Sequence, residues 1–293
     1  MHRSGTSAMA GMLSELGITG PSEDDLIPAT SSNARGHFES KLLTRVDNQL
    51  LRLCGGTWSA PPSVDSGWEL EPNIIAVKDF ARKAFHTTFP IRPMAWKDPR
   101  NCIVLPFWRS VLTPPVAAVF VYRDGLEVAR SLRARDDLTL IHGLALWERY
   151  LRSACAGIDG LPTFVAEYGR LLDAPASTCG ELVRFLADVG ITVQESAVQD
   201  AVASLDAGLR HERPSADEPS DLPVSQRDLF ARLDSLVGAH HPWRSPDLGT
   251  EPSWVDDVLS LRRDYEVLNR QIRSSRAMRL VETWWRVRAR MIF

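Results

Sequence analysis

A continuous apolar run over residues 116–122 constrains the fold of this chain most strongly. Such a run, without polar alternation, is typical of a strand that is buried on both faces in a parallel sheet. The run ends at Arg123, and residues 126–133 have a helical pattern. Residues 162–166 are a further strand candidate, followed by a helical pattern over 180–189. Strands that alternate with helices predict an α/β fold with a parallel sheet covered by helices on both faces.

The remaining segments follow the same pattern. Helices are predicted over residues 8–16, 38–53 and 73–89. Residues 94–96 are predicted as a short strand that ends at Lys97. Two irregular stretches rich in Gly, Pro, Ser, Asp or Asn, residues 21–36 and 55–72, are predicted as long loops, which are often functional. Because polar clusters follow the strand candidates, we expect ligands at the carboxyl ends of the strands.

The first seven residues indicate an anion site. Gly5 permits a tight bend, Ser4, Thr6 and Ser7 supply hydroxyl donors, and Arg3 adds a fixed positive fork. The first amides of the following helix point at whatever the loop holds, so we expect a phosphate or sulfate group there. A Walker A loop has a lysine after its last glycine, and here Gly5 is followed by threonine. This difference argues against an ordinary nucleotide triphosphatase.

A phosphate-binding loop of this kind normally follows a buried strand, whereas here the loop starts at residue 1. We therefore expect that a first strand is missing before residue 1. Without that strand the sheet would have an unfilled slot beside the loop, which is a costly defect in a core. The predicted domains are an α/β domain over residues 1–250 and a basic amphipathic helical tail over residues 251–293.

Arg123 and Ser131 are candidates for a second anion-binding element. They lie eight residues apart across a strand-to-helix turn, a spacing that allows both side chains to reach one anion. The spacing is common and indicates little by itself. Together with the N-terminal loop, it suggests two separate anionic groups on one ligand. A nucleotide with a 5′-phosphosulfate and a 3′-phosphate meets that demand.

Several segments resemble the sulfotransferase superfamily, whose donor is 3′-phosphoadenosine 5′-phosphosulfate. They are His2–Ser7, Val121–Gly125 with Ser131 and Leu132, Gly36–Glu39, Trp96–Arg100, Pro106–Trp108, and Glu167 and Tyr168 before Leu171 and Leu172. Together they look like a bacterial branch of that family and cover roughly residues 1–175. Lys97–Pro99 and Arg123–Gly125 are also similar to segments of tyrosylprotein sulfotransferases. The resemblance implies a three-layer P-loop-like fold with a central parallel sheet flanked by helices.

The resemblance also implies roles in sulfuryl transfer, which needs a base, positive charge at the transferring group and exclusion of water. Arg3 would supply charge, and Lys97 would reach the leaving oxygen, with an ion pair to Asp98 as its structural alternative. The resemblance to members that use a glutamate base makes Glu39 the first choice. His37 and Asp98 are its rivals. No metal is expected, because arginine, lysine and helix amides supply the charge.

A late basic residue often closes over the nucleotide phosphate in the resembling family, which makes Arg210 a donor contact, with a solvated loop arginine as the alternative. The chain lacks the R-K-G element of the cytosolic branch. The expected acceptor is a small molecule or glycan, such as a carbohydrate, a glycolipid or a secondary metabolite. An ATP-dependent P-loop phosphotransferase and a non-catalytic nucleotide-binding scaffold are the alternative functions.

Charge and composition restrict the partners. Residues 262–293 carry nine arginines against three acidic residues, a net charge of +6, which leaves −9 for the rest of the chain. A body of that sign is not expected to bind nucleic acid. The four widely separated cysteines are expected to be buried or half-buried thiols in a reducing compartment. With neither a signal pattern nor a long apolar run, the expected location is cytoplasmic.

The C-terminal tail has two parts. Val258, Leu261, Tyr265, Leu268 and Ile272 form a heptad seam of two heptads, fewer than the three to four that indicate a coiled coil. Residues 278–293 place tryptophans between arginines, a pattern similar to that of helices at membrane surfaces. Peripheral membrane contact, self-association and docking of the tail on its own domain all remain open at this point.

Overall fold

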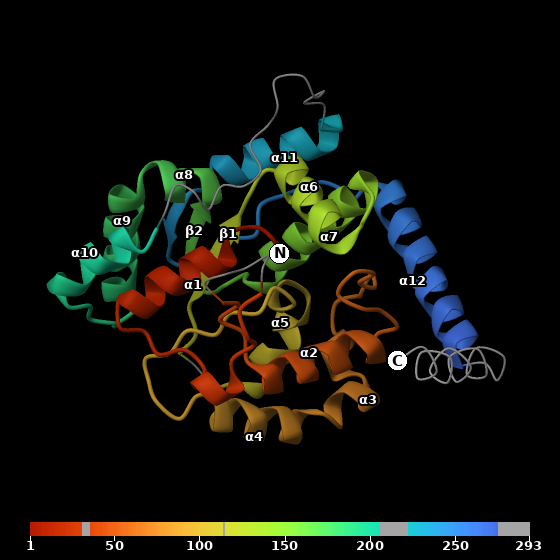
Figure 1. Cartoon of the computed structure of the whole chain (residues 1–293), viewed down its shortest axis with the longest axis horizontal. Helices are drawn as coiled ribbons and strands as arrows, with labels where there is room; N and C mark the ends of the chain where they lie inside the picture. The colour runs from red at the N-terminus through yellow and green to blue at the C-terminus, as the bar shows by residue number, and fades with distance from the viewer. Residues whose placement is uncertain (31–35, 114, 206–221, 275–293) are drawn as a thin grey trace, which may run out of the picture.

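The computed structural model describes residues 1–30, 36–113, 115–205 and 222–274. The chain is a mixed α/β protein, mostly helical, with one small sheet (Figure 1). The helices are α1 (Thr6–Glu15), α2 (Lys41–Leu53), α3 (Pro72–Ile75), α4 (Lys78–Thr88), α5 (Asn101–Val111), α6 (Gly125–Asp136), α7 (Leu140–Gly157), α8 (Tyr168–Asp173), α9 (Pro175–Asp188), α10 (Glu195–Ala203), α11 (Val224–Asp234) and α12 (Ser253–Ser274). The strands are β1 (Ala118–Tyr122), β2 (Thr163–Glu167) and β3 (Gly238–His240).

The sheet has the order β1-β2-β3. β1 and β2 are parallel, with Ala118 opposite Thr163 and Tyr122 opposite Glu167. The two apolar runs of the sequence are therefore strands, and their parallel pairing confirms the prediction. β3 pairs antiparallel with β2. Its three residues, Gly-Ala-His, have no strand-forming pattern, which is why the sequence did not indicate it.

The two faces of the sheet pack into different apolar clusters. Phe120 and Tyr122 of β1 belong to a large cluster built mainly from α2, α4, α5 and α7. Val121, between them, belongs to a second cluster with α1, α8 and α9. In Figure 1, α1, α9 and α10 lie on one side of β1 and β2, and α7 and α12 lie on the other. Because side chains alternate along a strand, both faces of these two strands are buried.

The helices α2, α6 and α8 begin at side-chain caps. Ser40 accepts a hydrogen bond from the Leu43 amide at the start of α2. Asp124 accepts two from the first turn of α6, directly after β1. Glu167 does the same for α8, directly after β2. Such caps satisfy helix amides that have no partner within the helix, so they set where each helix begins.

The short strand predicted over residues 94–96 is wrong. Met94 makes an isolated parallel bridge with Thr19, supported by hydrogen bonds on both sides of Thr19. Only single residues pair here, so a ladder does not develop. Lys97 therefore follows an extended loop segment. The predicted helix over residues 73–89 is divided into α3 and α4, and α5, which carries Pro106 within it, was not predicted.

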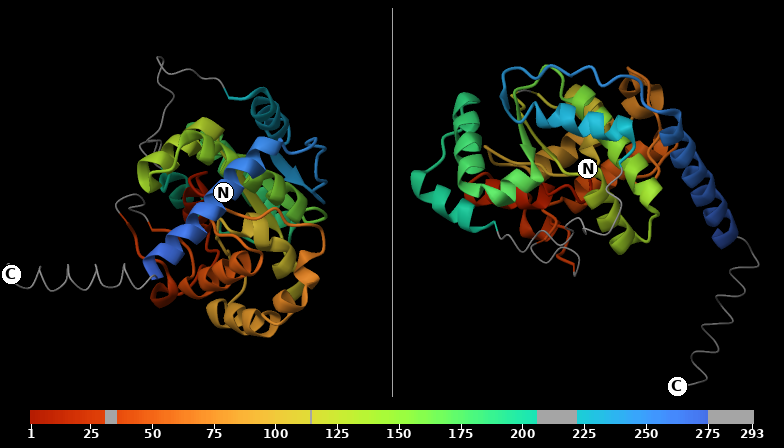
Figure 2. Two further views of the ribbon diagram at one scale, coloured as in Figure 1. Left: turned by 90° about the vertical axis from the view of Figure 1, so that its right-hand side faces the viewer. Right: turned by 90° about the horizontal axis from the view of Figure 1, so that it is seen from above.

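The first turns of α12 pack on the body of the protein. Val255 and Leu259 are buried in the large cluster, and Arg149 of α7 donates hydrogen bonds to Glu251 and Asp256. The outer part of α12 is exposed at Leu261 and at the other members of the heptad seam beyond it. Figure 2 shows α12 on the outside of the molecule, beyond α7 as seen from the sheet.

Two predicted features lie outside the described residues: Arg210 and the Trp- and Arg-rich segment over residues 278–293. The division at residue 250 stays a prediction. Among the helices that the structure describes, none has both the length and the apolar character needed to cross a membrane.

Candidate functional site

The N-terminal loop is shaped around Gly5. This residue is the N-cap of α1 and has a φ of 84°, in the left-handed region. No side chain accepts a hydrogen bond at this cap. The ring of Tyr168, the first residue of α8, packs against it. A Cβ atom at Gly5 would lie 2.0 Å from Cδ2 of Tyr168. Both the left-handed backbone and the close ring therefore require glycine at this position.

Arg3, Ser131 and Arg123, predicted from separate segments, meet at this loop. Arg3 Nε donates to Ser131 Oγ at 2.8 Å, which joins the loop to α6. Arg123 Nη1 donates to the carbonyl oxygen of Arg3 at 3.3 Å. The Arg123 guanidinium also lies over the ring of Tyr168, 4.9 Å from its centroid, and donates to Glu127. The carboxyl end of β1 therefore lies next to the N-terminal loop.

Three arginines, Arg3, Arg123 and Arg135, lie at the loop, and two of them have acidic partners, Glu127 for Arg123 and Asp136 for Arg135. Burial, together with the neighbouring charges of Arg135 and Arg123, lowers the pKa of Arg3. The two nearby arginines disfavour the charged form of Arg3, whereas Asp136 and Tyr168 favour it. Arg135, on α6, was not recognised from the sequence, since nothing in its local pattern distinguishes it from a solvated helix arginine. A bound anion would relieve the repulsion among these side chains.

The three predicted hydroxyl donors lie in different surroundings. Ser4 is fully buried, and its Oγ has no hydrogen-bond partner among the described residues. Thr6 lines a cavity on the inner side of α1. Ser7 is half-buried at the start of the helix. A buried hydroxyl without a partner costs free energy, and the role of all three as donors to a ligand stays a prediction.

Glu39 and Lys97 form a buried ion pair. Lys97 Nζ lies 2.5 Å from Glu39 Oε1 and donates to the carbonyl oxygen of His37 at 3.0 Å. Arg100 Nη1 lies 3.5 Å from the other oxygen of Glu39. The side chains of Lys97 and Glu39 are 12% and 7% exposed, so the pair is shielded from water. The alternative expected for Lys97 was an ion pair with Asp98. The structure instead pairs Lys97 with Glu39, the candidate base.

The two rival bases have different surroundings. Asp98 is buried and accepts hydrogen bonds from Thr44 Oγ1 and from the amide and guanidinium of Arg100. Through these hydrogen bonds Asp98 connects α2 to the start of α5. His37 is half-buried, and burial lowers its pKa while Glu39 raises it and Lys97 lowers it. Asp98 therefore has a structural role, and the roles of Asp98 and His37 as alternative bases stay predictions.

The loop and the ion pair belong to one electrostatic region. The pKa of His37 also responds to Arg135 and Arg3, which are the cations of the N-terminal loop. The region therefore combines a helix start that carries arginines with a shielded lysine and a carboxylate. Such an arrangement can hold an anionic group and move a proton from a hydroxyl.

Trp58 was missed as a neighbour of the loop. It lies in the second irregular stretch, residues 55–72. The centroid of its ring is 4.8 Å from that of His2 and 5.7 Å from the guanidinium carbon of Arg135, which lies over the ring. Its backbone carbonyl accepts a hydrogen bond from Tyr150. The Ser and Pro residues that surround Trp58 indicated only a loop, so the sequence held no signal for this contact.

In the parts of the chain that the structure describes, no group of three or more His, Cys, Asp or Glu side chains is arranged to hold a metal ion. All four cysteines are free thiols, with Cys155 and Cys179 buried. Comparison of the chain with protein-family models, with curated proteins and with solved structures gave no match.

Proposed function

We propose that the chain is a sulfotransferase that moves a sulfuryl group from 3′-phosphoadenosine 5′-phosphosulfate to a hydroxyl acceptor. The observation that carries the proposal is the hydrogen bond between Arg3 and Ser131. It joins the loop assigned to the 5′-phosphosulfate with the helix assigned to the 3′-phosphate. One nucleotide with two anionic ends can contact both elements only if they are adjacent.

The proposal includes the finer fold, a three-layer P-loop-like arrangement with a central parallel sheet. Its supports are the parallel pairing of β1 and β2, the two apolar clusters on opposite faces of β1, and the loop at the start of α1. A P-loop uses a helix start and backbone amides to hold an anion, and Gly5 gives the loop the required bend.

In the proposed reaction the acceptor hydroxyl gives its proton to the Glu39 carboxylate. The hydroxyl oxygen forms a bond to sulfur while the bond between sulfur and the phosphate oxygen breaks, and adenosine 3′,5′-bisphosphate leaves. Arg3 and Lys97 offset the negative charge that develops on the sulfuryl and leaving oxygens. The buried pair of Glu39 and Lys97 holds both groups in position and away from water.

Donor binding is tested by thermal shift with adenosine 3′,5′-bisphosphate and with ATP plus magnesium. We expect the bisphosphate to raise the melting temperature and ATP to have a smaller effect. S131A should weaken bisphosphate binding about tenfold, since one hydrogen bond to a charged group contributes about 1.5 kcal/mol or more. S110A is a matched control, because Ser110 bonds only a carbonyl of its own helix, α5. Stabilisation by ATP alone would favour the phosphotransferase.

Catalysis is tested at Glu39. E39Q should lower turnover about 100-fold or more while bisphosphate binding stays within about threefold, because a glutamine cannot accept the proton. The acceptor class is tested by incubating the protein and donor with carbohydrates, glycolipids and secondary metabolites and by mass spectrometry for added sulfate. A protein that binds the bisphosphate and sulfates none of them would be the nucleotide-binding scaffold. Unchanged turnover in E39Q would assign the proton transfer to another group.

A further inference from the structure

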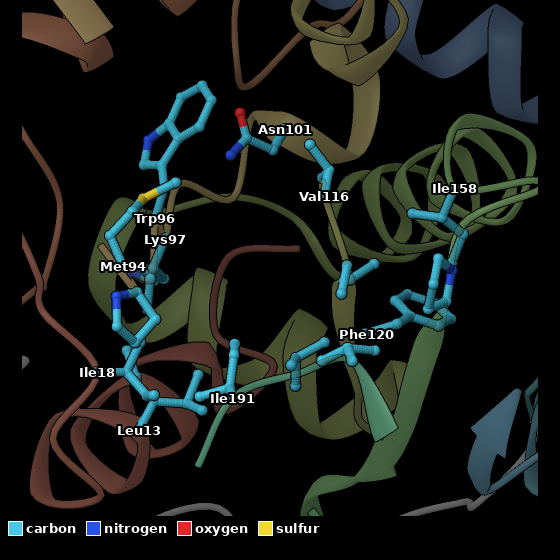
Figure 3. A pocket seen from close by; sticks show the side chains of 18 of the residues that line it. Leu13, Ile18, Met94, Trp96, Lys97, Asn101, Val116, Phe120, Ile158 and Ile191 are labelled. Carbon is cyan, nitrogen blue, oxygen red and sulfur yellow. The ribbon is translucent and has the colours of Figure 1, made fainter. Parts of the chain in front are cut away.

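A cavity of about 1060 Å³ lies between α1 and β1, with Lys97 among its lining residues (Figure 3). The lining is largely apolar and includes Leu13 and Phe120. Neither Glu39 nor His37 is among the described residues that line it. In the proposed reaction, the acceptor hydroxyl therefore reaches Glu39 from outside this cavity.

One face of α6 follows the site over three successive turns. Glu127, Ser131 and Arg135 are spaced by four residues, so their side chains lie on the same face of the helix. Glu127 accepts a hydrogen bond from Arg123. Ser131 accepts one from Arg3 of the N-terminal loop. Arg135 therefore lies one turn beyond the two elements that are assigned to the donor.

Trp58 positions the guanidinium of Arg135. The guanidinium carbon lies over the Trp58 ring, 5.7 Å from its centroid. The ring of His2 lies 4.8 Å from that of Trp58, which ties this contact to the N-terminal loop. A guanidinium that stacks on an aromatic ring has a fixed plane, and its N–H groups stay available for hydrogen bonds within that plane.

Most hydrogen-bond donors of Arg135 are left for a ligand. A guanidinium has five N–H donors. Nε of Arg135 donates to Asp136 at 2.7 Å, and neither Nη group donates to a residue in the part of the chain that the structure describes. The side chain is 21% exposed, so a ligand can reach it. Two Nη groups match the two oxygens of a carboxylate or sulfate.

Arg135 lies on the side of the site that carries the candidate base. Burial lowers the pKa of His37, and among the arginines that lower it further Arg135 has a larger effect than Arg3. The carbonyl of His37 accepts a hydrogen bond from Lys97, which pairs with Glu39. Arg135 is therefore near the place where the acceptor hydroxyl has to lie.

We propose that Arg135 binds an acidic group of the acceptor, which is then a hydroxyl compound with a carboxylate or a sulfate ester, such as an acidic carbohydrate. The inference rests on the proposed sulfotransferase function. In that function the anionic groups of the donor have Arg3, Arg123 and Ser131 as partners, which leaves Arg135 for the acceptor. An acidic group held there would determine which hydroxyl of the acceptor meets Glu39.

The test measures binding of three sugars to the full chain saturated with adenosine 3′,5′-bisphosphate, by isothermal titration calorimetry. The sugars are methyl β-D-glucuronide, methyl β-D-glucoside 6-sulfate and methyl β-D-glucoside, which differ only in the group at carbon 6. We expect at least one acid to bind about tenfold or more tightly than the neutral glucoside, because charge-assisted bidentate hydrogen bonds are the strong ones. The acid that binds more tightly identifies the group as a carboxylate or a sulfate.

R135Q should remove the preference for the acid, while its affinity for 3′-phosphoadenosine 5′-phosphosulfate without acceptor stays within about threefold. R133Q is the matched control and should keep the preference, since Arg133 is exposed on the same helix two residues earlier. W58L should lower the preference about threefold or more and leave binding of the neutral glucoside unchanged. A loss of packing alone would not separate the two sugars in this way.

An R135Q protein that keeps the preference would overturn the inference, as would the absence of a preference in the unmodified protein. A donor affinity that falls about tenfold or more in R135Q would assign Arg135 to the donor and would also overturn it. R135K keeps the charge without the planar fork and should lower the preference if R135Q does not fold. Failure of the unmodified protein to bind the donor would refute the sulfotransferase function itself, and this result is seen before any sugar is added.

Discussion

Gly5 and Tyr168 show how single residues fix the anion loop. The ring of Tyr168 occupies the place of a side chain at Gly5, and the Arg123 guanidinium lies over the same ring. The backbone of the loop and an arginine at the end of β1 are thus held by one aromatic residue from the end of β2. This contact joins three segments that lie far apart in the sequence.

Replacing Gly5 by alanine should destabilise the protein and weaken anion binding. G5A adds a clash with Tyr168 to the cost of a left-handed alanine, so we expect the free energy of unfolding to fall by about 3 kcal/mol. G17A is the control, because Gly17 has a φ of 82° with nothing within 4 Å of the added Cβ. Its loss should be about 1 kcal/mol, measured by urea unfolding. Equal losses would show that Tyr168 does not enforce glycine.

His2 should make stability depend on pH. Burial, and then the nearby Arg100 and Arg135, lower the pKa of His2 well below its usual value. Below about pH 6.5 the unfolded chain binds a proton there that the native protein does not bind. The free energy of unfolding should therefore fall with decreasing pH, by up to about 1.4 kcal/mol per unit from this group.

Urea unfolding at pH 7.5, 6.5 and 5.5 measures this slope. H2F keeps an aromatic ring against Trp58 and should lower the slope by about 1 kcal/mol per pH unit. H86Q, at an exposed histidine of α4, should leave it unchanged. The pKa values of His37 and His142 are also lowered. Both histidines are present in all three proteins, so their contribution to the slope is the same in each. An unchanged slope in H2F would show that His2 binds protons equally in the native and unfolded states, which contradicts the lowered pKa.

At the scale of elements, α12 holds the loop that carries Trp58. Glu266 accepts hydrogen bonds from Thr57 Oγ1 at 2.9 Å and from Ser59 Oγ at 2.7 Å. Arg263 donates to the carbonyl of Pro61. The tail helix is thus connected through Trp58 to His2 of the anion loop.

Removing the carboxylate at Glu266 should loosen this loop. We expect E266A to lower the free energy of unfolding by about 1–3 kcal/mol, because two hydroxyls lose a charged acceptor. The amide of Ala60, which bonds within the loop, should exchange faster. D264A replaces an exposed acid two residues earlier and serves as the control. If both variants exchange alike at Ala60, the loop is held by other contacts.

For the whole molecule, the exposed seam of α12 is the surface at which we expect self-association. Leu261, Tyr265, Leu268 and Ile272 are 70%, 53%, 54% and 48% exposed, which is unusual for large apolar residues at heptad spacing. Contacts with the rest of the protein reach as far as Glu266, which bonds Thr57 and Ser59, and leave these four side chains exposed. A second copy of the helix would cover them.

Sedimentation equilibrium tests this expectation. The full chain should form dimers, and L268E should weaken the association about tenfold or more, because the carboxylate would be buried against the partner helix. V267E adds the same charge beside the seam and should leave association nearly unchanged. Val267 is 43% exposed, so both substitutions begin from exposed positions. Equal association of the two variants would exclude the seam as the contact.

Two buried strands, their parallel pairing and the helices α1, α2, α6, α9 and α12 could be predicted from the sequence. Apolar runs and helical periodicity are local properties that mark burial before any fold is known. The sequence also predicted two anion-binding elements, one with Arg3 and Gly5 and one with Arg123 and Ser131, and the structure brings these two elements together. The short elements were not predicted correctly from the sequence. The conformations of β3 and of the segment at Met94 depend on the segments they pair with rather than on their own residues.

Which side chains meet depends on the tertiary structure. The pairing of Lys97 with Glu39, the contact of Tyr168 with Gly5 and the link from Glu266 to Ser59 join residues 58, 163 and 207 positions apart. No local pattern encodes such distances, because they follow from the order in which helices and strands pack. The cavity beside β1 is of the same kind: apolar residues from separate elements border it, and its existence depends on how those elements are held apart.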